Sequence, residues 1–143
     1  MDFRTKVELP LGQVSIGHAD PMMLWGSCFA ENIGKRLTDN KFSCDVNPFG
    51  VLYNPFSIAE ALSELLEGKP YTADRLLKHQ GVWFSLMHHS VFSSRSQEEC
   101  LARINGRFNA GRVHLQRADW LLFTWGTSRV YHWKADGRIV GNC

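Results

Sequence analysis

Two short apolar runs, each followed at once by a glycine, constrain the fold of this chain more than any other sequence feature. Residues 22–25 (Met-Met-Leu-Trp) end at Gly26, and residues 120–125 (Trp-Leu-Leu-Phe-Thr-Trp) end at Gly126. Neither run alternates apolar with polar side chains, and the second is typical of a strand covered on both faces. We therefore expect two buried strands, each stopped by a sharp turn, in an α/β unit with a mainly parallel sheet.

The segments between these runs carry apolar residues at helical spacing. After the first run, Phe29, Ile33 and Leu37 recur at every fourth position and are expected to face inward from one helix. The clearest helix starts after Asn54, whose side chain suits an N-cap, and closes at Gly68, which suits a left-handed C-cap. This order of strands and helices predicts one α/β unit.

Weaker patterns complete the expected order of elements. Residues 42–46 predict a short strand, and residues 82–92 an extended, aromatic-rich segment. The capping-box pattern Ser96-x-x-Glu99 predicts the start of a further helix. Asp-Gly at residues 136–137 predicts a hairpin.

The composition limits the expected partners, cofactors and location. The 143 residues are 44% apolar and 21% charged, which is typical of one globular domain, here residues 1–143. The net charge of +2, without a basic tract, gives no reason to expect nucleic acid as a partner. Because no run approaches the roughly 20 apolar residues of a membrane span and no secretory signal is present, we expect no membrane partner and a cytoplasmic location. The cysteines form no Cys-x-x-Cys pair, so neither a metal site nor a cofactor is expected.

The turn after the first strand is the first place to look for chemistry. Ligands of parallel α/β sheets bind beyond the carboxyl ends of the strands, and Gly26-Ser27-Cys28 lies at such an end. Free N–H groups at the start of the following helix favour a thiolate or alkoxide and can bind an oxyanion. Small residues also occupy such turns for steric reasons alone, so the turn by itself leaves both interpretations open.

The amino-acid sequence of this turn is also specific. Gly26-Ser27-Cys28-Phe29-Ala30 resembles the signature of the GSCFA domain family, a bacterial group that is similar to the SGNH or GDSL hydrolase superfamily. Further matching segments are Asn-Pro-Phe-Gly-Val-Leu-Tyr-Asn-Pro at 47–55, His-Ser at 89–90 and Phe-Thr-Trp-Gly-Thr-Ser at 123–128. The similarity runs from about residue 5 to the last residue.

The resemblance implies a three-layer α/β/α fold and hydrolysis or transfer of ester-linked acyl groups. It places Cys28 at the nucleophile position, with Ser27 as the competing nucleophile. Gly50 matches the glycine whose N–H enters the oxyanion hole, and Ser128 replaces the usual oxyanion asparagine. We expect four residues beside Gly50 to belong to the oxyanion or substrate-binding region: Gly126, Thr127, Ser128 and His89.

One block of the superfamily, the Asp-x-x-His that supplies the general base, has no match after residue 128. We therefore expect the domain to be incomplete at its C-terminus and the chain to be the N-terminal part of a longer protein. The first functional hypothesis is a hydrolase or acyltransferase acting on a small-molecule or carbohydrate ester. The alternative is a noncatalytic binding or scaffold domain. The oligomeric state stays open.

Overall fold

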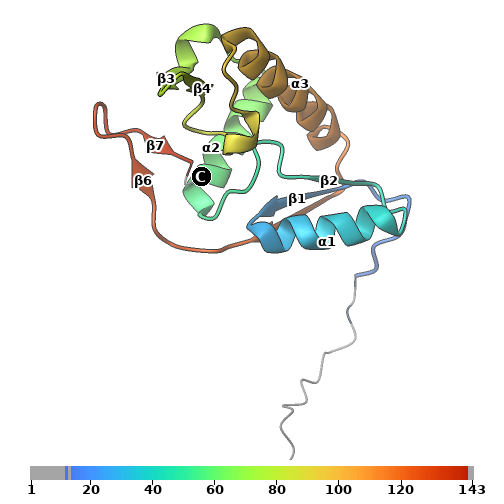
Figure 1. Ribbon diagram of the computed structural model, residues 1–143. Helices are drawn as coiled ribbons and strands as arrows, with labels where there is room; N and C mark the ends of the chain where they lie inside the picture. Colours follow the sequence, from blue (N-terminus) through green and yellow to red (C-terminus); the bar gives the residue numbers. More distant parts are fainter. Residues whose placement is uncertain (1–11, 13, 142–143) are drawn as a thin grey trace, which may run out of the picture.

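The computed structural model describes residue 12 and residues 14–141 of the chain (Figure 1). Within these residues, the α-helices are α1 (Cys28–Asp39), α2 (Pro55–Glu67) and α3 (Gln97–Leu115), and none of them is long and apolar enough to cross a membrane. The strands are β1 (Met22–Gly26), β2 (Cys44–Val46), β3 (Leu77–His79), β4 (Val82–Phe84), β5 (Trp120–Thr124), β6 (Tyr131–His132) and β7 (Ile139–Val140). The short 3-10 helices are η1 (Ala73–Arg75) and η2 (Ser90–Phe92).

The central sheet consists of three parallel strands in the order β2-β1-β5. Gly26 of β1 lies opposite Thr124 of β5, and Leu24 lies opposite Val46 of β2, so the three strands end at one edge of the sheet. The pairs β3-β4 and β6-β7 are antiparallel hairpins. The expected α/β class, the parallel sheet and the hairpin around residues 136–137 are therefore confirmed.

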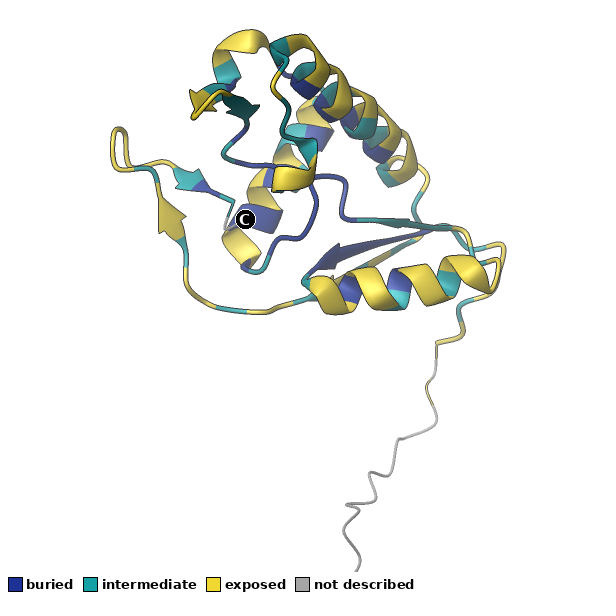
Figure 2. Cartoon of the chain, in the orientation of Figure 1, coloured by how far each residue is buried: buried dark blue, intermediate teal, exposed yellow. Residues whose placement is uncertain are grey.

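Side chains of β1 point alternately into two apolar cores. Met23 and Trp25 pack with residues of α2 and α3, whereas Met22 and Leu24 pack with Ala30 of α1. Figure 1 shows the same division, with α1 on one face of the sheet and α2 and α3 on the other. All five residues of β1 are buried (Figure 2). The first apolar run does not alternate because β1 is the central strand between two helical layers.

Each α-helix begins at a side chain that accepts a hydrogen bond from the backbone of its first turn. These caps satisfy N–H groups that have no acceptor inside the helix. Gly68 ends α2 at φ 70°, as expected from the sequence. The three cap pairs are Ser27 with the Phe29 N–H at 3.3 Å, Asn54 with the Ser57 N–H at 2.8 Å, and Ser96 with the Glu99 N–H at 3.2 Å.

The expectation that β5 is covered on both faces is wrong. Leu121, Phe123 and Trp125 are 44%, 36% and 57% exposed and lie on one side of the strand and its extension. The cause is the place of β5 at the edge of the sheet, where these side chains do not join the core that α2 and α3 form over Met23 and Trp25. An apolar run shows that both faces of a strand can be buried, but in β5 only one face is packed.

The expected inward face of α1 is also wrong at its first position. Phe29 is 60% exposed, whereas Ile33 and Leu37 pack against the core that Met22 and Leu24 form with α1. At Gly34, α1 lies so near the sheet that a Cβ atom would come within 2.2 Å of the Val46 side chain. This close approach turns the face containing Ala30 and Gly34 toward the sheet and leaves Phe29 on the flank.

The segment 82–92 is extended only in part. β4 ends at Phe84, and the chain then turns before η2. The adjacent His88 and His89 therefore do not lie on a strand. His88 is buried, and His89 is the residue that precedes η2.

Candidate active site at the carboxyl edge of the sheet

The turn between β1 and α1 presents a thiol at the carboxyl edge of the sheet. Cys28 is the first residue of α1 and is exposed, directly after five buried residues of β1 and the cap residue Ser27. The Ser27 hydroxyl accepts the Phe29 N–H at 3.3 Å. In the described chain the Cys28 N–H has no protein acceptor. The Cys28 sulfur thus lies beside a helix N-terminus whose dipole favours negative charge.

Two side chains that the sequence analysis did not single out hold this turn in place. The Gly26 N–H donates to Asn47 Oδ1 at 2.8 Å, and the Ser27 N–H donates to Thr124 Oγ1 at 3.2 Å. Gly26 has φ 138°, and a Cβ atom there would lie 2.1 Å from the Thr124 carbonyl oxygen. Only glycine fits this position, because both the backbone conformation and the contact with β5 exclude a side chain. The position of Asn47 after a strand and before a proline was the only signal in the sequence.

Gly50 and His89 lie together. A Cβ atom on Gly50 would lie 2.3 Å from the His89 Cβ, and the His89 N–H donates to the Phe49 carbonyl at 2.9 Å. The Gly50 N–H donates to the Asn47 carbonyl at 2.8 Å, so in this structure it is engaged inside a turn. His89 Nδ1 accepts the Val91 N–H at 3.2 Å.

The second strand end is joined to the first through the segment between Gly50 and Asn54. The Leu52 N–H donates to the Gly26 carbonyl at 3.1 Å. One residue later, the Tyr53 carbonyl accepts the N–H groups of Gly126 and Thr127 at 2.8 and 3.1 Å. The structure therefore ties the Gly26 turn and the Gly126 turn to neighbouring residues of one segment.

Ser128 is exposed next to the Gly126 turn. The preceding residue, Thr127, uses its hydroxyl to accept the Arg129 N–H at 3.1 Å. Ser128 itself is exposed and takes part in no hydrogen bond within the part of the chain that the structure describes. Ser128 is thus an expected oxyanion residue whose hydroxyl donor forms no hydrogen bond within the described chain.

The other described cysteines differ from Cys28 in environment. Burial, followed by the charge of Asp45, raises the pKa of Cys44 to about 11. Burial also raises the pKa of Cys100, which packs in the core. Both thiols are therefore protonated at neutral pH, while Cys143 lies outside the described residues. No group of three or more His, Cys, Asp or Glu residues in the described ranges could hold a metal ion.

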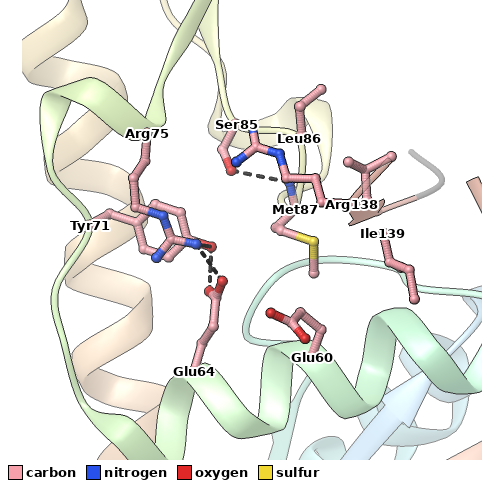
Figure 3. A pocket seen from close by; sticks show the side chains of 10 residues that line it. Glu60, Glu64, Tyr71, Arg75, Ser85, Leu86, Met87, Arg138 and Ile139 are labelled. Atoms are coloured by element: carbon pink, nitrogen blue, oxygen red, sulfur yellow. Dashed lines mark hydrogen bonds and ion pairs between the residues drawn. The ribbon is translucent and has the colours of Figure 1, made fainter. Parts of the chain in front are cut away.

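A pocket of about 250 Å³ lies away from this turn, between α2, η1 and β7 (Figure 3). On one wall, Glu64 of α2 bonds both the Tyr71 hydroxyl and the Arg75 guanidinium, and the Arg75 guanidinium lies 3.8 Å from the centre of the Tyr71 ring. Burial and then Glu64 raise the pKa of Tyr71 well above its usual range, so Tyr71 is neutral. Spacing in the sequence gave no signal for this cluster, since α2, η1 and the connection between them fold together to form it.

His88 borders this cluster and lies against Phe49. Its Nδ1 atom is 3.0 Å from Ser85 Oγ, and its ring stacks on Phe49 with centroids 4.4 Å apart. Burial, followed by the charge of Arg75, lowers the pKa of His88 to about 3. His88 is therefore neutral at physiological pH, and its low basicity makes it a poor general base.

Comparison with known protein families gives a match over most of the chain. The family model of the GSCFA family matches residues 21–143, which is most of the chain and includes both strand-end turns. No curated protein and no solved structure matches the chain significantly.

Proposed function

Because this chain belongs to the GSCFA family, we propose that it transfers acyl groups from small-molecule or carbohydrate esters through the thiol of Cys28. The observation that carries the proposal is the exposed Cys28 thiol at the first residue of α1, beyond the end of a buried parallel strand. Parallel sheets bind ligands at this edge. The helical layers on both faces of the sheet support the three-layer SGNH-like fold that the resemblance implies.

The reaction begins when the Cys28 thiolate attacks the acyl carbon of the ester. The electron pair of sulfur forms a thioester bond, the ester C–O bond breaks, and the alcohol leaves with the proton that the Cys28 thiol lost when the thiolate formed. Water or a second alcohol then attacks the thioester and releases the thiol. Hydrolysis and acyl transfer therefore differ only in the second nucleophile.

Cys28 is a better candidate than Ser27 for the nucleophile. The Ser27 hydroxyl caps α1, while the Cys28 thiol is exposed and has no such role. The Cys28 N–H, which has no acceptor among the described residues, is one candidate donor to the oxyanion, and the exposed Ser128 hydroxyl is a second. Because the Gly50 N–H already donates to Asn47, it joins an oxyanion hole only if that turn rearranges.

The test is turnover of p-nitrophenyl acetate by the protein and by the Cys28→Ala and Ser27→Ala variants. We expect Cys28→Ala to abolish turnover, since it removes the attacking atom. Ser27→Ala should retain turnover with a loss of stability of about 1 kcal/mol, because it removes a helix cap. Ser63→Ala, an exposed position on α2, is the matched control. Unchanged turnover in Cys28→Ala would remove the proposed nucleophile.

A noncatalytic binding domain is the second candidate function. The observation in its favour is that the Gly50 N–H and the His89 Nδ1 atom both serve internal hydrogen bonds. Under this alternative, Cys28→Ala does not change the turnover of p-nitrophenyl acetate. The turnover assay thus separates the two candidates.

A further inference from the structure

The pocket beside α2 is lined by both polar and apolar side chains. Figure 3 shows Glu60 and Glu64 projecting from α2, with Tyr71 and Arg75 against Glu64 and Arg138 across the pocket from the helix. The lining is completed by Ser85 and by four apolar residues: Leu86, Met87, Ile139 and Val140. Its volume of about 250 Å³ is below the roughly 300–1,000 Å³ of pockets for drug-sized ligands. The pocket therefore suits a smaller molecule.

The charges that line the pocket fall into two kinds. Glu64 and Arg75 form an ion pair and neutralise each other. The Glu60 carboxylate forms no hydrogen bond or ion pair with any described residue. Arg138 is held at 3.4 Å from Asp136 through Nε, which leaves the two terminal nitrogens of its guanidinium for a ligand. The same pocket is thus lined by one carboxylate without a partner and by one guanidinium that pairs with Asp136 but keeps two nitrogens without an acceptor.

We propose that this pocket binds a small zwitterion, the class represented by a free aliphatic amino acid. The Glu60 carboxylate accepts hydrogen bonds from the α-ammonium group, and the Arg138 guanidinium donates to the α-carboxylate. The aliphatic side chain packs against Met87 and Ile139. This site is independent of acyl transfer at Cys28, because no pocket residue belongs to the Gly26 turn.

Charge balance favours a zwitterion over the other small ligands. A ligand that leaves water must keep its charged partners paired, since unpaired buried charges are costly. A simple anion can bind Arg138 but leaves the Glu60 carboxylate without a partner, and a simple cation can bind Glu60 but leaves the terminal nitrogens of Arg138 without an acceptor. A zwitterion pairs Glu60 and Arg138 at the same time, and charge-assisted hydrogen bonds are stronger than the neutral ones a sugar hydroxyl would offer.

The test is calorimetric titration of the full chain with L-leucine, supported by NMR shifts of the pocket residues. The comparison ligands are 4-methylpentanoate, which lacks the ammonium group, leucinamide, which lacks the carboxylate, and glucose. We expect L-leucine to bind and each comparison ligand to bind at least about tenfold more weakly, since each loses a charge-assisted hydrogen bond.

Variants assign the two ends of the ligand. Glu60→Gln should weaken L-leucine binding about tenfold and remove the preference for L-leucine over 4-methylpentanoate. Arg138→Gln should do the same for the preference over leucinamide. Glu67→Gln on α2 and Arg129→Gln, both exposed and outside the pocket, are the matched controls and should bind as the unaltered protein does.

Several outcomes would overturn the proposal. These are no binding of L-leucine at millimolar concentration, equal binding of L-leucine and its two singly charged analogues, and binding of glucose in its place. Full binding by both Glu60→Gln and Arg138→Gln would do the same. Loss of ester turnover in Cys28→Ala leaves this titration unaffected, so the two proposals fail separately.

Discussion

Lowering the pH should destabilise this protein through His88, a buried side chain that stays neutral when folded. His88 is only 5% exposed and lies among aromatic rings, stacked on Phe49 and at the edge of Tyr71 and Phe92. Burial and then the charge of Arg75 lower its pKa from 6.5 to about 3. Over a range of pH, His88 is therefore protonated in the unfolded chain and neutral in the folded chain.

The size of the effect follows from the two pKa values. Between pH 6.5 and about 3, the unfolded state holds a proton on His88 that the folded state lacks, so stability falls as the pH falls. Each unit of pH in this window is worth about 1.4 kcal/mol. Lowering the pH from 7 to 5 should thus cost about 2 kcal/mol through His88 alone.

The assay is urea unfolding at pH 7 and pH 5 for the unaltered protein and for His88→Gln, which keeps a polar side chain but cannot titrate. We expect the loss of stability on acidification to be about 2 kcal/mol smaller in His88→Gln. His79→Gln, at an exposed strand position, should behave like the unaltered protein. Equal pH dependence in the unaltered protein and His88→Gln would refute the reasoning. If the variant does not fold, NMR decides, because the His88 ring signals should not shift between pH 7 and 5.

Three substitutions test the packing around the two sites by urea unfolding. Gly26→Ala should cost more than about 4 kcal/mol or prevent folding, because its Cβ would lie 2.1 Å from the Thr124 carbonyl oxygen; a loss below about 1 kcal/mol would contradict this contact. Asn54→Ala should cost about 2 kcal/mol, since it removes a buried cap and leaves the Ser57 N–H without its acceptor; an unchanged midpoint would speak against the cap. Glu64→Gln should cost about 1–2 kcal/mol through its bonds with Tyr71 and Arg75, whereas the exposed Glu67→Gln should stay within about 0.5 kcal/mol; equal effects would show that the cluster contributes nothing.

Local rules predicted the elements that local interactions determine. The N-cap at Asn54 and the C-cap at Gly68 bounded α2, and the apolar run before Gly26 marked β1. The turn at Ser27 and Cys28 was also predictable, because the glycine, the cap and the helix start are consecutive in sequence. These features need only neighbouring residues to form.

Features that depend on partners distant in the sequence could not be predicted from it. Leu121 and Phe123 are as apolar as the buried residues of β1, and only the sheet order shows that they lie on an edge strand. Arg75 and Glu64 come together because η1 folds back onto α2. Asn47 of the segment after β2 bonds Gly26 of β1, and the position of Asn47 between a strand and a proline did not identify Gly26 as its partner.

Activation of the Cys28 thiol toward acyl groups by the fold is tested most directly by acetylation. The protein is mixed with p-nitrophenyl acetate, and the rate at which the Cys28 peptide gains one acetyl group is followed by mass spectrometry, in the folded protein and in urea. Cys44 and Cys100, whose pKa values burial raises, serve as internal controls. We predict that Cys28 is acetylated faster in the folded protein than in the unfolded chain, while Cys44 and Cys100 react faster when unfolded. A Cys28 rate that is equal or slower in the folded protein would contradict the claim.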